Sequence, residues 1–153
     1  MERRMRKNVK GPYVTVGVQG TEATKPRKPK PGEEDVERAF GSTNIELALV
    51  HEFGSRDGRV PQRSFIRASV DRERKMLNEM LKDTVVAIAA GSNARIAIGL
   101  VGAKARAEMV RTIDNSIGLK PLKRRTIMAK GSTRPLIDTA QLKQALTWKA
   151  YNV

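Results

Sequence analysis

The sequence predicts an α+β fold, a small antiparallel sheet with two amphipathic helices packed on one face, plus extended arms. Two observations favour this class. Apolar residues alternate in short stretches near both ends of the chain, which is the pattern of strands with one buried face. Between them, two long stretches carry apolar residues at intervals of three and four, which is the pattern of helices. The length of 153 residues suits a single domain, 1–153.

The first part of the chain contains one strand between two basic segments. Residues 1–10 carry five basic side chains and one acidic one, and we expect a solvated N-terminal arm. Alternating valines predict a strand over residues 13–19. Residues 20–35 should form an extended loop, because three prolines oppose a helix and four cations repel one another. These cations are Lys25, Arg27, Lys28 and Lys30.

Two elements follow before the middle of the chain. Asn44 can cap a short helical or extended segment over residues 45–53, which Gly54 ends. A long helix should begin at Ser69 or Asp71 and stop at Gly91. Its expected buried stripe is Leu77, Leu81, Val85 and Ile88, with Met80 and Val86 beside it.

A second long helix should begin near Asn93 and end about Gly118. Its expected shared face is Ile96, Leu100, Ala103, Ala107, Val110 and Ile117, with Met109 and Ile113 beside it. Gly99 and Gly102 cost this helix about 1 kcal/mol each relative to alanine, so we expect a neighbouring element to approach its backbone closely there.

The last third is predicted to end in a strand. A basic connector over residues 120–126 and a polar loop over residues 130–135 come first. Asp138 or Thr139 can then cap a turn of helix that runs through Leu142. Alternation of Leu146, Trp148 and Ala150 with polar residues predicts the closing strand.

The residue inventory argues against an enzyme. Cysteine is absent, which excludes thiolate metal sites and cysteine nucleophiles. His51 is the only histidine, and Ser55 stands where an HExxH zinc motif needs its second one. No nucleophile elbow or phosphate loop occurs. We therefore predict no catalytic residue, no cofactor and no metal site.

Neither membrane insertion nor export is expected. The longest apolar stretch, residues 85–90, is far shorter than the about 20 residues that span a bilayer. The basic residues 1–7 are not followed by the apolar segment of a signal peptide.

Three motifs in order resemble one known family. They are His51-Glu52-Phe53-Gly54 followed by the segment Val-Pro-Gln-Arg-Ser-Phe-Ile-Arg at 60–67, the helix over 99–117, and the segment Pro-Leu-Ile-Asp-Thr at 135–139 with Gln141 and Leu142. Together with Thr126-Ile127 and the Lys-Gly-Ser at 130–132, they are similar to the virion-morphogenesis, or tail-completion and neck, proteins of tailed bacteriophages. The similar region is 44–153. Ala140 stands where that family usually has glycine, and the basic loop is longer than the motif needs.

The resemblance implies a structural role in the virion. Such proteins form rings at the head-tail junction, so it implies a neck, tail-completion or tail-terminator subunit that assembles in the host cytoplasm and stays in the neck or tail. The expected partners are other copies of the chain, in a hexamer that matches the tail, and a connector, tail-tube or sheath ring. Non-specific contact with passing DNA is also compatible with it.

Eight residues are candidates for the interfaces of such a ring. In residues 60–67, Phe65 would anchor a neighbour while Arg63 and Arg67 pair with its acidic groups; alternatively, Phe65 and Ile66 fill the core. The four cations of the loop, Lys25, Arg27, Lys28 and Lys30, could reach a neighbour, and Trp148 lies either in the sheet or against a partner ring. For His51 we expect a partly buried structural residue, and for Glu52 a salt bridge to a nearby arginine.

The charge leaves a second function open. Thirty Lys and Arg against sixteen Asp and Glu give a net charge of +14, which suits a small nucleic-acid-binding protein. Six aromatic residues, most of them in hydrophobic patterns, make a base-stacking platform a poor expectation. The basic residues could equally solvate the surface or meet acidic partner proteins.

Overall fold

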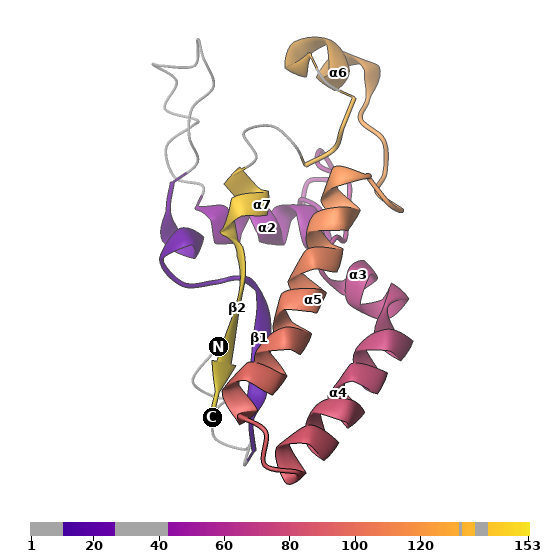
Figure 1. Ribbon diagram of the computed structural model, residues 1–153. Coiled ribbons are helices and arrows are strands. Elements are labelled where there is room, and N and C mark those ends of the chain that lie inside the picture. The colour runs from indigo at the N-terminus through magenta and orange to yellow at the C-terminus, as the bar shows by residue number, and fades with distance from the viewer. Residues whose placement is uncertain (1–10, 27–42, 132, 137–140) are drawn as a thin grey trace.

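The computed structural model describes residues 11–26, 43–131, 133–136 and 141–153, with the side chains of 129 and 130 left aside (Figure 1). The predicted arm over 1–10, most of the loop with Arg27, Lys28 and Lys30, and the caps Asp138 and Thr139 lie outside these residues. The elements in order are β1 (Tyr13–Val18), the 3-10 turn η1 (Thr21–Thr24), α2 (Asn44–Phe53), α3 (Arg67–Arg72), α4 (Arg74–Ala89), α5 (Ala94–Asp114), α6 (Arg124–Lys130), α7 (Gln141–Ala145) and β2 (Leu146–Tyr151).

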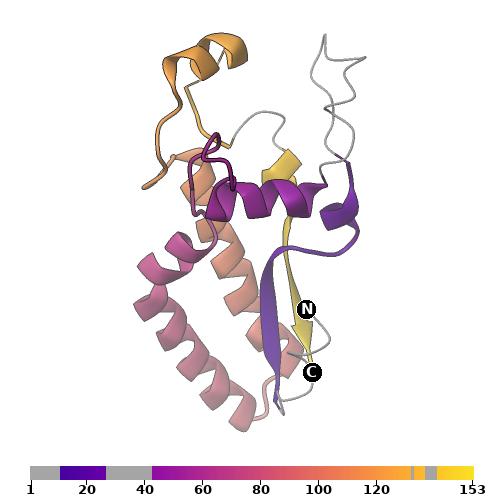
Figure 2. The same cartoon turned by 180° about the vertical axis from the view of Figure 1, so that it is seen from behind.

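The predicted α+β class is confirmed. Strands β1 and β2 form a two-stranded antiparallel sheet in which Tyr13 pairs with Tyr151 and Val18 with Leu146. Helix α5 lies along the sheet and contacts both strands, while α4 packs against α5 on the side away from the strands (Figures 1 and 2). The two long helices are therefore on one side of the sheet, but only α5 rests directly on it.

The core forms where α5 meets the elements around it. Its main cluster joins α2, α5, α7 and the start of β2 through Ala48, Phe65, Met109, Ile113, Leu119, Leu136, Leu142 and Leu146. A smaller cluster of Leu77, Val101 and Ala105 joins α4 to α5, with Val16 of β1 packed against it. Both clusters use the same face of α5.

That face differs from the predicted one. The buried side chains of α5 include Ile98, Val101 and Ala105 together with Met109 and Ile113, which were expected beside the face. The expected face itself begins with Ile96 and Leu100, which are exposed. The prediction was wrong because α5 is apolar on two sides in its first half, so the spacing of its apolar residues does not say which side meets the sheet. Gly99 and Gly102 determine which side of α5 meets the sheet.

Gly99 and Gly102 confirm the predicted close approach. A Cβ atom built on Gly102 would lie 2.5 Å from Val14 Cγ2 and 3.1 Å from Trp148 Cβ, and one on Gly99 would lie 2.9 Å from Trp148 Cη2. The absence of side chains at these positions lets both strands approach the α5 backbone. Glycine therefore fixes which side of α5 faces the sheet.

The predicted first long helix is broken in two. Glu73, with φ −95° and ψ 11°, separates α3 from α4. Of its expected stripe only Leu77 is buried, whereas Leu81 and Val85 are exposed. Asn93 does cap α5 as predicted, with its side chain accepting a hydrogen bond from the Ile96 backbone N–H, but α5 ends at Asp114 rather than near Gly118.

Two further local predictions need correction. The cap of α2 is Thr43, not Asn44: Thr43 Oγ1 accepts from the Glu46 backbone N–H while the Glu46 carboxylate accepts from the Thr43 N–H, a reciprocal capping box. Asn44 is buried inside the first turn, where its Nδ2 donates to the Glu22 carbonyl at 2.7 Å. The predicted connector over 120–126 turns into α6, which projects from the body of the molecule (Figure 1).

Candidate interaction surfaces

Glu52 joins residues 51–54 to residues 60–67, the two parts of the first motif of the family resemblance. Its carboxylate, at the end of α2, is buried and accepts four hydrogen bonds from the segment before α3. Ser64 Oγ (2.6 Å) and the Arg67 backbone N–H (3.0 Å) donate to Oε1, and the backbone N–H groups of Phe65 and Ile66 donate to Oε2, both at 3.0 Å. Glu52 therefore supplies the acceptors that the start of α3 lacks. The expected salt bridge to an arginine side chain is wrong.

The three interface candidates of residues 60–67 have different positions. Phe65 is fully buried in the main core, so the alternative that it fills the core is the correct one. Arg63 is also buried: its guanidinium donates to the carbonyls of Lys120 (2.7 Å) and Pro121 (3.3 Å), and burial lowers its pKa from the ordinary value. It cannot pair with a neighbour's acid in this fold. Arg67 is exposed and remains available for an interface.

A second buried polar cluster joins α3 to α5. Thr112 Oγ1 lies 2.7 Å from Ser69 Oγ, accepts a hydrogen bond from the Arg72 guanidinium at 2.7 Å and donates to the Glu108 carbonyl. One turn away, the buried Glu108 carboxylate meets Lys104 Nζ at 2.9 Å and Arg111 at 3.4 Å. The hydrogen bond from Lys104 is the main reason that the pKa of Glu108 lies below its ordinary value. The bonds of Thr112 hold α3 against α5, whereas the ion pairs of Glu108 lie within α5.

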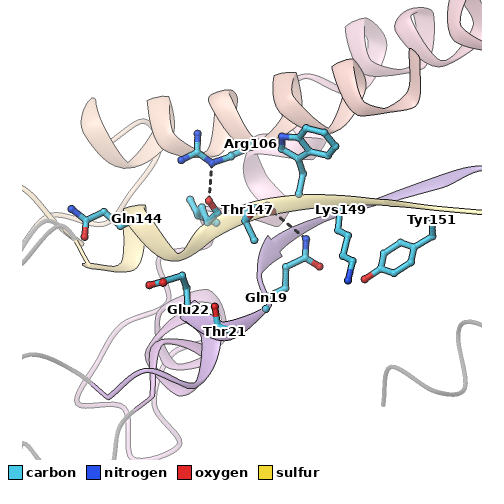
Figure 3. A pocket seen from close by; sticks show the side chains of 11 residues that line it. Gln19, Thr21, Glu22, Arg106, Gln144, Thr147, Lys149 and Tyr151 are labelled. Atoms are coloured by element: carbon cyan, nitrogen blue, oxygen red, sulfur yellow. Dashed lines mark hydrogen bonds between the residues drawn. The ribbon is translucent and has the colours of Figure 1, made fainter. Parts of the chain in front are cut away.

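The open face of the sheet borders a shallow groove of about 780 Å³ (Figure 3). The polar groups around it are bonded to the backbone of β2: Gln19 Nε2 donates to the Thr147 carbonyl at 3.3 Å and Arg106 Nε to the Leu146 carbonyl at 2.7 Å. Lys149 and Tyr151 also line it. Figure 3 shows these side chains spread along the strand instead of converging on one point. The side chains of Gln19 and Arg106 thus bind the backbone carbonyls of β2, and the groove does not gather polar groups at one point as a ligand site would.

Two groups of large apolar side chains are exposed on helices. The first, which we call the α2 face, consists of Ile45, Leu49 and Phe53, spaced by four and 42–63% exposed. The second, the hairpin tip, consists of Val85 and Val86 at the end of α4 with Ile96 and Leu100 at the start of α5, 61–68% exposed. The tip lies at one end of α5, and α2 crosses near the other end (Figures 1 and 2). Large exposed apolar groups of this kind mark interaction surfaces.

The sequence indicates these surfaces indirectly, because α4 and α5 carry more apolar residues than the fold buries. Val85 from the stripe expected to be buried on α4, and Ile96 and Leu100 from the face expected to be buried on α5, are among the side chains that the structure leaves exposed at the tip. More apolar faces are present than one small sheet can cover.

The remaining candidates lie on the surface. Lys25 is exposed and forms an ion pair with Glu22 inside its own chain. Trp148 is 37% exposed, with its indole against Gly99 and Gly102 of α5, so it both packs on the helix and faces solvent. His51 is partly buried, as expected, and its carbonyl accepts the Arg63 backbone N–H at 2.7 Å.

A basic segment surrounds the projecting helix α6. Residues 115–137 contain six Lys and Arg and no acidic residue. Of these, Lys120, Lys123, Arg124 and Arg125 are exposed. The segment is therefore a concentrated positive surface at the end of the molecule opposite the hairpin tip (Figure 1).

The described residues form neither a metal site nor a membrane-spanning helix, and the chain matches no known family. Within the part of the chain that the structure describes, there is no group of three or more His, Asp or Glu that could hold a metal ion. None of the helices among those residues has both the length and the apolar character needed to cross a bilayer. No protein-family model, curated protein or solved structure matches the chain.

Proposed function

We propose that this chain is a structural, non-enzymatic virion protein of a tailed bacteriophage, a neck or tail-completion subunit that assembles into a ring at the head-tail junction. The observation that carries the proposal is the pair of exposed apolar surfaces, the α2 face and the hairpin tip, on different parts of a small subunit. A ring subunit needs two different contact surfaces, one for each neighbour. A protein that acts alone has no need of them.

The motifs support the phage assignment. His51-Glu52-Phe53-Gly54 and the Ser-Phe-Ile-Arg at 64–67 resemble the family in sequence, and Glu52 binds the second motif through four hydrogen bonds. These residues build a buried connection. A buried connection of this kind is consistent with a structural role for the two motifs.

The test is removal of the gene from the phage or prophage that encodes it. Electron microscopy of the lysate should show heads and tails that do not join, or tails that lack their terminal ring, and expression of the intact chain from a plasmid should restore complete virions. Normal, infectious particles in the absence of the gene would refute the proposal.

The acid-free basic segment favours a second candidate, a protein that binds nucleic acid through α6. Four exposed cations could contact phosphates, and each contact would add about 0.9 to the slope of log affinity against log salt concentration. Affinity for bare double-stranded DNA, measured from 50 to 200 mM salt, separates the candidates. Steep dependence that disappears when Lys120, Lys123, Arg124 and Arg125 are changed to glutamine would support this second function; no binding would exclude it.

A further inference from the structure

The two apolar surfaces lie in segments of the chain that carry few like charges. Lys and Arg make up 30 of 153 residues, and the net charge is +14. Yet residues 84–103, which contain the hairpin tip, carry a single charged side chain, Arg95, and residues 43–55, which contain the α2 face, carry no Lys or Arg. Two copies of so basic a chain repel each other, so they can approach most easily through these two surfaces.

The same distribution argues against an acidic partner at these surfaces. An acidic protein or a nucleic acid would be attracted to the basic segment 115–137, which lies at the other end of α5 from the tip. Within residues 84–103 only Arg95 would attract it, with Lys82 and Lys104 one turn outside the tip, so the attraction is weaker there than at the basic segment. A second copy of this basic chain is repelled least where the surface carries few cations, so the tip suits a second copy as its partner.

The few charges present also distinguish the ways in which two copies could meet. Glu46 is exposed beside Ile45 on α2, and Arg95 is exposed beside Ile96 at the tip. Contact between the tip of one copy and the α2 face of another brings opposite charges together. Contact of two tips would oppose Arg95 to Arg95, and contact of two α2 faces would oppose Glu46 to Glu46, and both arrangements are unfavourable.

We propose that the hairpin tip of one subunit docks against the α2 face of a second copy, in a head-to-tail contact. The proposal rests on the proposed function, because it names the contact through which a ring would be built. Since the two surfaces are different and lie on separate parts of the molecule, each subunit keeps one of each free for the next neighbour. Such heterologous contacts produce rings when the rotation closes.

Single cysteines test the contact directly, because the chain has none of its own. We would prepare Leu49→Cys on the α2 face and Leu100→Cys at the tip, tag one of them to change its size, and treat each alone and the mixture with a short bismaleimide. Both positions are exposed, so the fold should be retained. The proposal expects the mixed dimer and little of either symmetric dimer. Predominance of a symmetric dimer would overturn it.

The control is Asn78→Cys, an exposed position on α4 about 12 Å along the helix from Val86. Its mixture with Leu49→Cys should cross-link far less than the mixture that contains Leu100→Cys. Equal cross-linking in the two mixtures would show collisions without specificity and would overturn the proposal.

Sedimentation separates failure of this contact from failure of the proposed function. Val86→Glu should raise the dissociation constant for self-association roughly tenfold to a hundredfold, whereas Asn78→Glu, which adds the same charge on the same helix, should leave it within about twofold. If the unmodified chain assembles and Val86→Glu assembles equally well, the tip is not the interface, and the ring function survives with another contact. If the unmodified chain stays monomeric, the head-to-tail contact is refuted, and the gene-deletion experiment decides the function on its own.

Discussion

At the scale of single residues, Glu52 has the largest structural role among the motif residues. A carboxylate that takes four hydrogen bonds in a buried position replaces the water that three backbone N–H groups and a hydroxyl would otherwise need. Helix-capping patterns cannot identify this role from the sequence, because they relate residues a few positions apart. The acceptor lies in α2, and its donors lie 12 to 15 residues later. The two local residues proposed as caps, Ser69 and Asp71, already lie inside α3.

Glu52→Gln should destabilise the fold by about 2–4 kcal/mol. In either orientation the glutamine NH2 would face two of the four donors, and because only the Ser64 hydroxyl can turn to accept, at least one buried backbone N–H would lose its acceptor. The lost bond costs about 1–3 kcal/mol, and the remaining bonds lose the strength that the carboxylate charge gives them. Urea unfolding followed by circular dichroism measures the change. Glu46→Gln, which alters the exposed carboxylate of the α2 capping box, is the matched control and should cost under about 1 kcal/mol. Equal effects of the two changes would contradict the assigned role.

Gly102 provides a second prediction at this scale. Alanine normally gains about 1 kcal/mol over glycine inside a helix, but here its methyl carbon would lie 2.5 Å from Val14 Cγ2. We expect Gly102→Ala to lower stability by about 1–3 kcal/mol, because β1 would have to move away from α5. Gly99→Ala, whose nearest neighbour is the outer edge of the partly exposed Trp148 ring, should be milder. Thermal melts of the two variants compare them, and a more stable Gly102→Ala would refute the packing argument.

At the scale of elements, α5 shows how far sequence reasoning reaches. Its existence, its Asn93 cap and the purpose of its glycines were predictable, because capping and backbone approach are local requirements. Its buried face was not, since a helix with apolar residues on two sides has no unique orientation in sequence. The broken α3–α4 helix and the projecting α6 were missed for a related reason: tertiary contacts, such as those of Glu52 with the start of α3, decide where these segments begin and end.

The ion pairs of Glu108 with Lys104 and Arg111, all within α5, should make the free energy of unfolding depend on pH. The pKa of Glu108 is lowered in the folded chain by Lys104, so its charged form contributes stability above the ordinary glutamate pKa of about 4.3. That contribution is lost as the pH falls through the lower, folded-state pKa. Urea unfolding measured from pH 6 down to pH 3 should therefore show a fall in the free energy of unfolding, and this fall should be smaller for Glu108→Gln than for the unmodified chain. An identical decline in both proteins would show that other carboxylates are responsible.

At the scale of the whole molecule, the candidate surfaces could be predicted only in part. The basic segments were visible in composition, and Lys25, Arg67 and Trp148 do lie on the surface. Arg63 and Phe65 do not, because an arginine among apolar residues can be satisfied by buried carbonyls as well as by a partner's acids. The exposed apolar surfaces emerged only when the structure showed which faces the small sheet leaves uncovered.

Salt should strengthen self-association of the whole subunit. Copies with a net charge of +14 repel each other, and salt shortens the range of that repulsion to about 8 Å at 0.15 M. An apolar head-to-tail contact then forms more readily. Sedimentation at 50 and 500 mM salt should show more assembly at the higher concentration, the opposite of the trend for binding to DNA. Dissociation by salt would indicate that ion pairs dominate the contact.

The pairing of β1 with β2 also governs how the protein is made. Val14 and Val16 leave the ribosome early, but their partners Ala150 and Trp148 are synthesised after all the helices. The glycine face of α5 therefore stays uncovered by the sheet until both strands are present, and β1 has no paired strand while residues 146–151 are still to be synthesised. The sheet can close only when residues 146–151 have emerged. An incomplete chain released before that point would carry an unpaired β1 and an uncovered glycine face of α5 into the cell, where it would be prone to aggregation and proteolysis.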